Sequence, residues 1–296
     1  MFVKSLKTLS LKDTKIAGGK GASLGEMIKE RIPIPPGFVV LTHAFEKFLD
    51  KDCIKKYNAE KIRGTILKTK FPEELGKEIL KSFDKLGVKY VAVRSSASCE
   101  DSKKDAWAGQ LESYLYVTRN VLLKRVQNCW MSLYSSRALS YKKARKLEGK
   151  DISMAVVIQE MINSDVSGIC FTIHPMTLNR NHMLIEACWG LGELLVRGAV
   201  NPDSYVVEKK TFNLIDTNIS LQKEQLIGKV NKCCIIAVSK NKQGKQKLKQ
   251  SEIIKLAKMC DSIEKHYGKP QDIEWVLKKG KFYIVQSRPI TTFNER

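Results

Sequence analysis

Residues 272–289 restrict the possible folds of this chain more than any other stretch, because they combine two strand-like runs with a regular polar pattern. Residues 273–277 and 282–285 are rich in β-branched and aromatic side chains and flank Lys278-Lys279-Gly280, which predicts a β-hairpin with glycine at a positive-φ position. A three-residue loop would place alternate polar residues of both strands on one face. These residues are Asp272, Glu274, Gln286 and Arg288.

The polar face of this hairpin has two interpretations. Two acids, an amide and a guanidinium group suit a cation together with the phosphates that it neutralises. The alternative is a solvent-exposed sheet face crossed by an ordinary salt bridge, since most charged side chains lie on the surface. The hairpin taken alone leaves both interpretations open.

The bulk composition excludes several classes of protein. A chain of 296 residues with 43% hydrophobic and 28% charged residues has the composition of a folded protein with a substantial core. No apolar run is long enough to span a membrane and the first residues lack a signal-peptide core, so we expect a cytoplasmic protein without a membrane partner. The net charge of +21 favours polyanions in general, but the lysines are spread along the chain without a nucleic-acid-binding motif.

Two segments in the first third carry residue types suited to phosphate. Gly18-Gly19-Lys20-Gly21 leads into a helical pattern, so backbone N–H groups and Lys20 can approach an anion at the helix N-terminus, although a plain glycine-rich helix entry fits equally well. Arg94 ends an apolar strand in a serine-rich turn, where its forked guanidinium can grip a phosphate. A surface ion pair of Arg94 with Glu100 or Asp101 is the alternative.

Three further positions come from the middle of the chain. The periodicity of residues 120–147 predicts one long helix, on which Arg137 taken alone is expected to be a solvated charge. Residues 153–162 predict a buried strand with a polar end at Gln159, which is able to receive an adenine edge. Gly109 would allow a loop to close over a ligand.

The motifs also occur in the order found in one family. They are Gly18-Gly19-Lys20-Gly21-Ala22-Ser23-Leu24-Gly25, Val93-Arg94-Ser95-Ser96, Ala108-Gly109-Gln110, Val157-Ile158-Gln159-Glu160-Met161, Gly190-Leu191-Gly192 with Asn201-Pro202-Asp203, and the two hairpin strands. The chain resembles the N-terminal ATP-binding domain of phosphoenolpyruvate synthase and pyruvate phosphate dikinase, which is also present in rifampicin phosphotransferase. The resemblance covers essentially the whole sequence.

The resemblance implies an α+β protein with the ATP-grasp fold, in which the nucleotide lies between two lobes. We therefore expect a single nucleotide-binding domain over residues 1–296, with an N-terminal lobe of roughly residues 1–110 and a second lobe over 111–296. The phosphohistidine and substrate domains of the full-length enzymes are expected to be absent from this chain.

Residue roles follow from the same resemblance, position by position. The phosphate-binding and catalytic positions are matched by Lys20, Arg94 and Arg288. The Mg²⁺ ligands are matched by Glu274 and Gln286, with Asp272 as an acid beside them. Other nucleotide-binding positions are matched by Gly109 and Ser113 in a loop over the nucleotide, Gln159 on the adenine side, and Arg137 as a further basic residue.

The implied reaction is transfer of the β-phosphoryl group of ATP to a histidine on a separate domain or protein, which leaves AMP. ATP and Mg²⁺ are the expected cofactors, and the expected partner is a protein that carries the phosphohistidine and substrate domains. Pyruvate, an antibiotic and a glucan are all compatible final acceptors. The alternatives are a non-catalytic ATP-binding regulatory module and, ranked lower, a nucleic-acid-binding protein.

Overall fold

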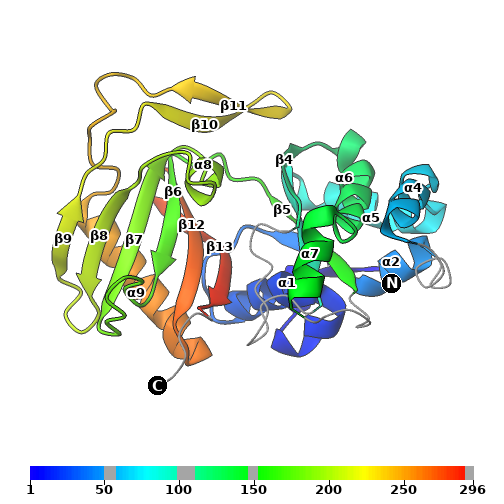
Figure 1. The fold of residues 1–296 in the computed structure, drawn as a ribbon, viewed down its shortest axis with the longest axis horizontal. Helices are drawn as coiled ribbons and strands as arrows, with labels where there is room; N and C mark the ends of the chain where they lie inside the picture. The colour runs from blue at the N-terminus through cyan, green and yellow to red at the C-terminus, as the bar shows by residue number, and fades with distance from the viewer. Residues whose placement is uncertain (50–57, 99–110, 146–152, 291–296) are drawn as a thin grey trace. The chain divides into compact units, whose positions relative to one another are not determined.

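The chain divides into two compact units of mixed helix and sheet. The computed structural model describes residues 1–49, 58–98, 111–145 and 153–290 (Figure 1). The first unit comprises Met1–Lys29 and Pro36–Met161, and the second comprises Glu30–Pro35 and Ile162–Arg296. The expected α+β class is confirmed, whereas the boundary lies after Met161 and not near residue 110. The reason is that a strand at 154–160 pairs within the sheet of the first unit.

The first unit is an antiparallel five-stranded sheet with the strand order β1-β2-β5-β3-β4. Its elements are β1 (Val3–Ser5), 3-10 helices η1 (Leu6–Thr8) and η2 (Leu11–Asp13), α1 (Thr14–Lys29), β2 (Gly37–Val40), α2 (Thr42–Phe48), α4 (Ala59–Lys68), α5 (Glu73–Leu86), β3 (Val91–Ala97), β4 (Ser113–Val117), α6 (Arg119–Ser132), α7 (Ser136–Ala144) and β5 (Met154–Glu160). The expectation of one continuous helix over 120–147 is wrong. Ser135 caps a new helix that begins at Ser136, because its side chain accepts a hydrogen bond from the N–H of Ala138.

One face of this first sheet carries the hydrophobic core of the unit. Alternate residues of the central strands, such as Val93 and Ile158, pack with residues of the helices, such as Phe45, Ile79 and Trp130. Because side chains alternate along a strand, the residues between these core positions project from the opposite face of the sheet. Helix α1 packs on that opposite face, where Gly21 lies against Val39.

The second unit is an antiparallel six-stranded sheet with the order β13-β12-β6-β7-β8-β9, accompanied by a two-stranded sheet of β10 and β11. Its elements are β6 (Val166–Phe171), β7 (His182–Trp189), α8 (Glu193–Val196), β8 (Asp203–Glu208), β9 (Leu214–Asn218), β10 (Glu224–Lys229), β11 (Lys232–Ala237), α9 (Gln250–Tyr267), β12 (Gln271–Lys278) and β13 (Lys281–Pro289). Helix α9 covers one face of the larger sheet with an apolar stripe that includes Ile253, Leu256 and Cys260 (Figure 1). The other face is left for polar side chains.

A fully buried ion pair ties the segment before α9 to this larger sheet. The ammonium group of Lys247 donates to Asp203 over 2.6 Å, and neither side chain is exposed. The same carboxylate accepts hydrogen bonds from the Tyr205 hydroxyl at 2.8 Å and the Ser220 N–H at 2.9 Å. Because its oxygens are satisfied in this way, the pair fixes the position of the chain at a site where an unpaired charge would cost about 3–5 kcal/mol. No helix in the described part of the chain is long and apolar enough to cross a membrane.

Candidate functional site

The polar face of the second unit is built by the register of β12 with its two neighbours. Asp272 pairs with Arg288 and Glu274 pairs with Gln286 across the hairpin. On the other side of β12, Glu274 pairs with Ile169, which in turn pairs with Glu186 on β7. Directly opposed residues project from the same face of a sheet, so three carboxylates, an amide and a guanidinium share the face that α9 does not cover.

This shared face depends on a bulge that the sequence pattern did not reveal. The hairpin turn contains two residues, Lys279 and Gly280, both with positive φ, and Lys278 pairs directly with Lys281. The expected three-residue loop is therefore wrong. A two-residue turn alone would direct Gln286 to the face opposite Glu274, but the register shifts between Glu274 and Trp275 and makes Val285 an extra residue in β13. The shift restores the predicted common face.

Asp272 and Arg288 are in direct contact on this face. One carboxylate oxygen of Asp272 accepts hydrogen bonds from Arg288 Nε at 2.9 Å and from Nη2 at 2.6 Å. The two side chains are only 13% and 25% exposed, so this is not the open surface salt bridge of the alternative interpretation. The pair holds a guanidinium group at the open end of the hairpin, while the second oxygen of Asp272 is not part of this contact.

Burial acts on the carboxylates of this face. It raises the pKa of Asp272, against the opposing charge and hydrogen bonds of Arg288. Burial also raises the pKa of Glu186, with a smaller contribution from the negative charge of Asp272. Raised acid pKa values show that negative charge is held here at an electrostatic cost. A cation bound on this face would lower that cost.

The donors on this face fit Mg²⁺ brought in by a nucleotide better than a metal held by protein alone. In the ranges that the structure describes, no three His, Cys, Asp or Glu side chains are grouped as a metal site. Glu274 and Gln286 nevertheless present a carboxylate and an amide oxygen from directly paired positions. Mg²⁺ is commonly bound by one or two such groups, with phosphates and water as its other ligands.

In the first unit, the register places three predicted residues on the face that α1 covers. Arg94 of β3 pairs with Ser113 of β4 on one side and with Val157 of β5 on the other. Gln159, which pairs with Ala92, lies two positions along β5 from Val157 and so projects from the same face. Gln159 is almost fully buried, Arg94 is half-buried and Ser113 is exposed.

A serine connects the glycine-rich segment to the strand that carries Arg94. Ser96 Oγ donates to the carbonyl oxygen of Ala17 at 2.9 Å and accepts from the N–H of Gly21 at 3.2 Å. Gly18 interrupts α1 with φ = 69°, and a Cβ at this position would overlap the Ser96 side chain and carbonyl group. Lys20 lies in the helical turn that follows. The two phosphate motifs of the sequence are therefore one local structure, and Ser96 is the residue that sequence reasoning missed.

The sheet registers and the Ser96 hydrogen bonds leave two predicted site residues to be placed, Arg137 and Gly109. Arg137 lies at the start of α7 and makes a loose ion pair with Glu112 at 3.7 Å, with side-chain exposures of 66% and 46%. This geometry is that of a surface ion pair. Gly109, together with Glu100 and Asp101, falls outside the described residues.

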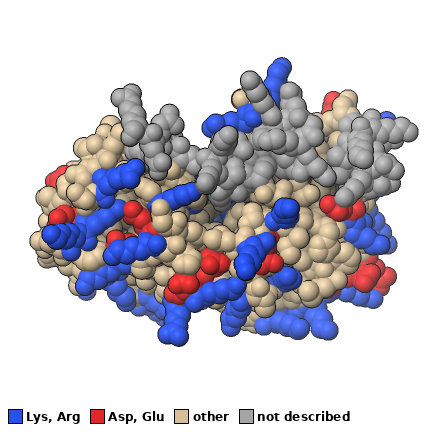
Figure 2. All heavy atoms as spheres, turned by 90° about the horizontal axis from the view of Figure 1, so that it is seen from below, with Lys and Arg blue, Asp and Glu red and all other residues tan. Residues whose placement is uncertain are grey.

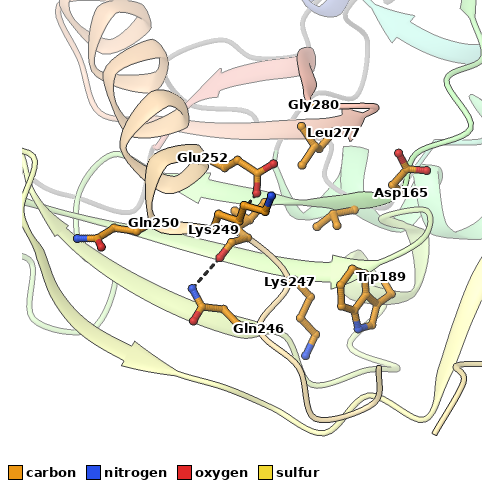
Figure 3. Close-up of a pocket in the computed structure, with 11 residues that line it drawn as sticks. Asp165, Trp189, Gln246, Lys247, Lys249, Gln250, Glu252, Leu277 and Gly280 are labelled. Atoms are coloured by element: carbon orange, nitrogen blue, oxygen red, sulfur yellow. Dashed lines mark hydrogen bonds between the residues drawn. The ribbon is translucent and has the colours of Figure 1, made fainter. Parts of the chain in front are cut away.

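A cavity in the second unit lies away from these residues. It has a volume of about 600 Å³ and is lined by Trp189, Lys249, Glu252 and Gly280 among others (Figure 3). Gly280 belongs to the hairpin turn, at the opposite end of the strands from the Asp272–Arg288 pair. None of the predicted site residues lines it. The polar face, and not this cavity, is therefore the candidate site in this unit.

Comparison with known proteins agrees with the order of the motifs. A family model described as "Pyruvate phosphate dikinase, AMP/ATP-binding domain" matches residues 14–296. A probable phosphoenolpyruvate synthase of Methanocaldococcus jannaschii is 39% identical over 99% of this chain and 27% of its own length. The phosphoenolpyruvate synthase of Pyrococcus furiosus is 36% identical over 99% of this chain and 44% of its own length.

Two more distant similarities complete the comparison. An uncharacterized phosphotransferase of Bacillus subtilis is 34% identical over 95% of this chain and 34% of its own length. The crystal structure of D-alanine-D-alanine ligase from Helicobacter pylori covers 94% of this chain and 54% of that chain, with a TM-score of 0.37 and 12% identity. The chain thus spans less than half the length of these curated relatives.

The first prediction concerns the contact of Gly18 with Ser96. Replacing Gly18 by alanine should lower the free energy of unfolding by about 2–4 kcal/mol, because the new Cβ both strains a positive φ and displaces β3. Urea denaturation measures the loss. The matched control is Gly64→Ala on α4, where no atom lies within 4 Å of the new Cβ and helix propensity predicts a gain of up to about 1 kcal/mol. Equal stability of the Gly18→Ala variant and the wild type would contradict the close approach of Gly18 to Ser96.

The second prediction concerns the raised pKa of Glu186. The pKa of Glu186 is higher in the folded chain than in the unfolded chain, where it is about 4.3. The folded state therefore has its full stability below the unfolded pKa and loses stability as pH rises through the folded pKa. The variant Glu186→Gln lacks this titration, so its free energy of unfolding relative to the wild type should increase from pH 4 to pH 7. Denaturation at both pH values measures this difference. If the stability of Glu186→Gln relative to the wild type fell as pH rises, the raised pKa of Glu186 would be contradicted.

Proposed function

Because the chain belongs to the pyruvate phosphate dikinase AMP/ATP-binding family, we propose that it binds ATP with Mg²⁺ and transfers the β-phosphoryl group to a histidine on a separate domain or protein, leaving AMP. The bond between the β- and γ-phosphorus atoms must also break, so water takes up the γ-phosphoryl group, which is released as inorganic phosphate. The observation that carries this proposal is the family match over residues 14–296, which includes every predicted site residue. The ATP-grasp fold and the organisation as one nucleotide-binding domain of two lobes belong to the same proposal.

The second unit would hold the metal and part of the phosphate chain. Glu274 and Gln286 would bind Mg²⁺, which neutralises phosphate charge when it is bound. Arg288 would donate to a phosphate oxygen, and its contact with Asp272 keeps the guanidinium group in one orientation. In this role Asp272 acts mainly by orienting Arg288, and it projects from the same face as Glu274 and Gln286.

The first unit would contribute the other nucleotide contacts. Lys20 and Arg94 would neutralise phosphate charge, and the Ser96 hydrogen bonds support this by fixing the glycine-rich segment to β3. Gln159 would accept the adenine edge, and Gly109 and Ser113 would lie in the loop over the nucleotide. Arg137 is retained as a further basic contact. These groups position the phosphates and offset developing charge, which is the main task of a protein in phosphoryl transfer.

The phosphoryl acceptor would be a histidine supplied by a phosphohistidine domain outside this sequence. The relatives are more than twice as long as the matched region, which supports a role for further domains in the complete reaction. The comparisons do not favour a nucleic-acid-binding protein. On the one face drawn in Figure 2, lysine and arginine side chains are spread over the surface with acidic side chains between them. Nothing in the geometry favours a non-catalytic module either.

The third prediction tests the reaction and its metal together. The chain is mixed with Mg²⁺, a phosphohistidine domain from a related enzyme and ATP that carries a label on its β-phosphoryl group. Chromatography should then detect AMP and the label on the histidine domain. Chelation of Mg²⁺, or the change Glu274→Ala, should reduce the rate at least about 100-fold. The control is Glu224→Ala, a change at an exposed residue of β10, which should leave the rate unchanged. Absence of AMP with a competent histidine domain would exclude the transfer reaction, and full activity of Glu274→Ala would exclude its metal role.

The fourth prediction separates charge from geometry at Arg94. Arg94→Lys keeps the positive charge but loses the planar fork, so we expect a loss of about 10²-fold in kcat. The control is Arg119→Lys, because Arg119 also uses its fork, on Asp84, at an exposed site on α6. Initial rates of AMP formation measure both variants. Equal, small effects of the two changes would show that the fork of Arg94 does not contact phosphate.

A further inference from the structure

The ribbon formed by β10 and β11 stands apart from the six-stranded sheet of its unit. Among the strands that the structure describes, its two strands pair only with each other, from Glu224 opposite Ala237 to Lys229 opposite Lys232. The ribbon is joined to the body through β10, where the N–H of Leu191 donates to the carbonyl oxygen of Leu226 at 2.8 Å. Figure 1 shows β10 on the side of β6–β9 and β11 on the outer side. The free edge of the ribbon is therefore β11.

This free edge is unusually apolar. Cys233-Cys234-Ile235-Ile236-Ala237 form five consecutive apolar residues, and Ile235 is 55% exposed. Within the described part of the chain, no backbone hydrogen bond reaches β11 from any strand other than β10. An isolated two-stranded ribbon is only marginally stable in water, and an apolar edge with unpaired backbone groups is a template for another strand.

The two edges of the neighbouring sheet are protected in ways that β11 is not. The edge strand β9 carries Asp216, and a charge on an edge disfavours pairing with another chain. The opposite edge strand, β13, is covered, because the N–H of Ile284 donates to the carbonyl oxygen of Pro33 at 2.8 Å. The exposure of β11 is therefore a local feature and not a general property of this unit.

The charges around the ribbon indicate what kind of strand would pair with it. Residues 223–245 contain six lysines and one glutamate, Glu224. Lys232 begins β11 and Lys240 follows it closely, so both ends of the apolar run are flanked by positive charge. A second copy of this chain would bring lysines against lysines, and a nucleic acid would not use an apolar strand edge.

We propose that β11 binds an extended segment of another protein as a third strand, and that this segment has an apolar centre and acidic flanks. Backbone hydrogen bonds along the edge would provide affinity, alternate apolar side chains would pack beside Ile235, and the flanking acids would meet Lys232 and Lys240. This binding site is independent of the proposed ATP chemistry.

The fifth prediction uses three synthetic peptides and the full chain. The first has a centre of alternating valine and threonine between pairs of aspartate, the second has lysine in place of aspartate, and the third has a central proline. Hydrogen exchange followed by mass spectrometry or NMR should show that the aspartate peptide slows exchange of the β11 amides about tenfold at saturation. The lysine and proline peptides should bind at least about tenfold more weakly.

Variants of the chain locate the binding strand. Ile235→Asp should weaken binding of the aspartate peptide at least about tenfold, because the change replaces an apolar contact with a charge of the same sign as the peptide's flanks. Ile215→Asp on β9 is the matched control, since Ile215 is 51% exposed on an edge strand of the same unit, and it should leave binding unchanged. Thermal unfolding checks that both variants fold.

Several results would overturn the proposal. They are absence of β11 protection, equal binding of the aspartate and lysine peptides, and equal effects of Ile235→Asp and Ile215→Asp. Concentration-dependent dimerisation that protects β11 would assign the edge to a second copy, and protection by single-stranded DNA would assign it to nucleic acid. Either of these would replace the proposed acidic segment.

Discussion

The register between β12 and β13 is the constraint on which the polar face of the second unit depends. A side chain has only two directions along a strand, so one residue more or less in a hairpin exchanges the two faces. The turn at Lys279 and Gly280 would separate the acids of β12 from the polar residues of β13. The extra residue, Val285, reverses that effect and turns Gln286 and Arg288 toward Glu274 and Asp272. The bulge is thus a requirement of the site and not an irregularity of the sheet.

The same division of faces organises both units, and it explains why the polar residues are tolerated. In each sheet one face supports the hydrophobic core, through α9 in the second unit and through helices such as α6 in the first. The opposite face is then free to hold charged and amide side chains without opening the core. In the first unit this requires close approach of α1 to β3, which only a glycine at position 18 permits.

What the sequence could predict depended on how local each feature was. Alternation along residues 272–274 and 286–288 predicted the common face correctly, although the loop length behind it was wrong, because a bulge leaves no mark in a polar pattern. The break at Ser135 was missed because apolar periodicity continued across it. Ser96 was missed because its partners, Ala17 and Gly21, lie far away in sequence and only the folded sheet brings them together. The β10–β11 ribbon lacks a glycine turn signal, since its turn is made by Val230 and Asn231.

The electrostatics of the polar face set it apart from the rest of the molecule. The chain has a large positive net charge, yet this face gathers acids whose pKa values are raised by burial. A buried carboxylate with a raised pKa opposes folding at neutral pH, and packing alone gives no reason to place Glu186 and Asp272 on one face. Such a local conflict with stability is typical of a binding site, because a ligand of opposite charge relieves it. In the proposed function, the metal that accompanies ATP would supply that charge, and Arg288 on the same face would meet a phosphate. A ligand would thus account for the acids and the guanidinium group of this face together, which the fold alone does not.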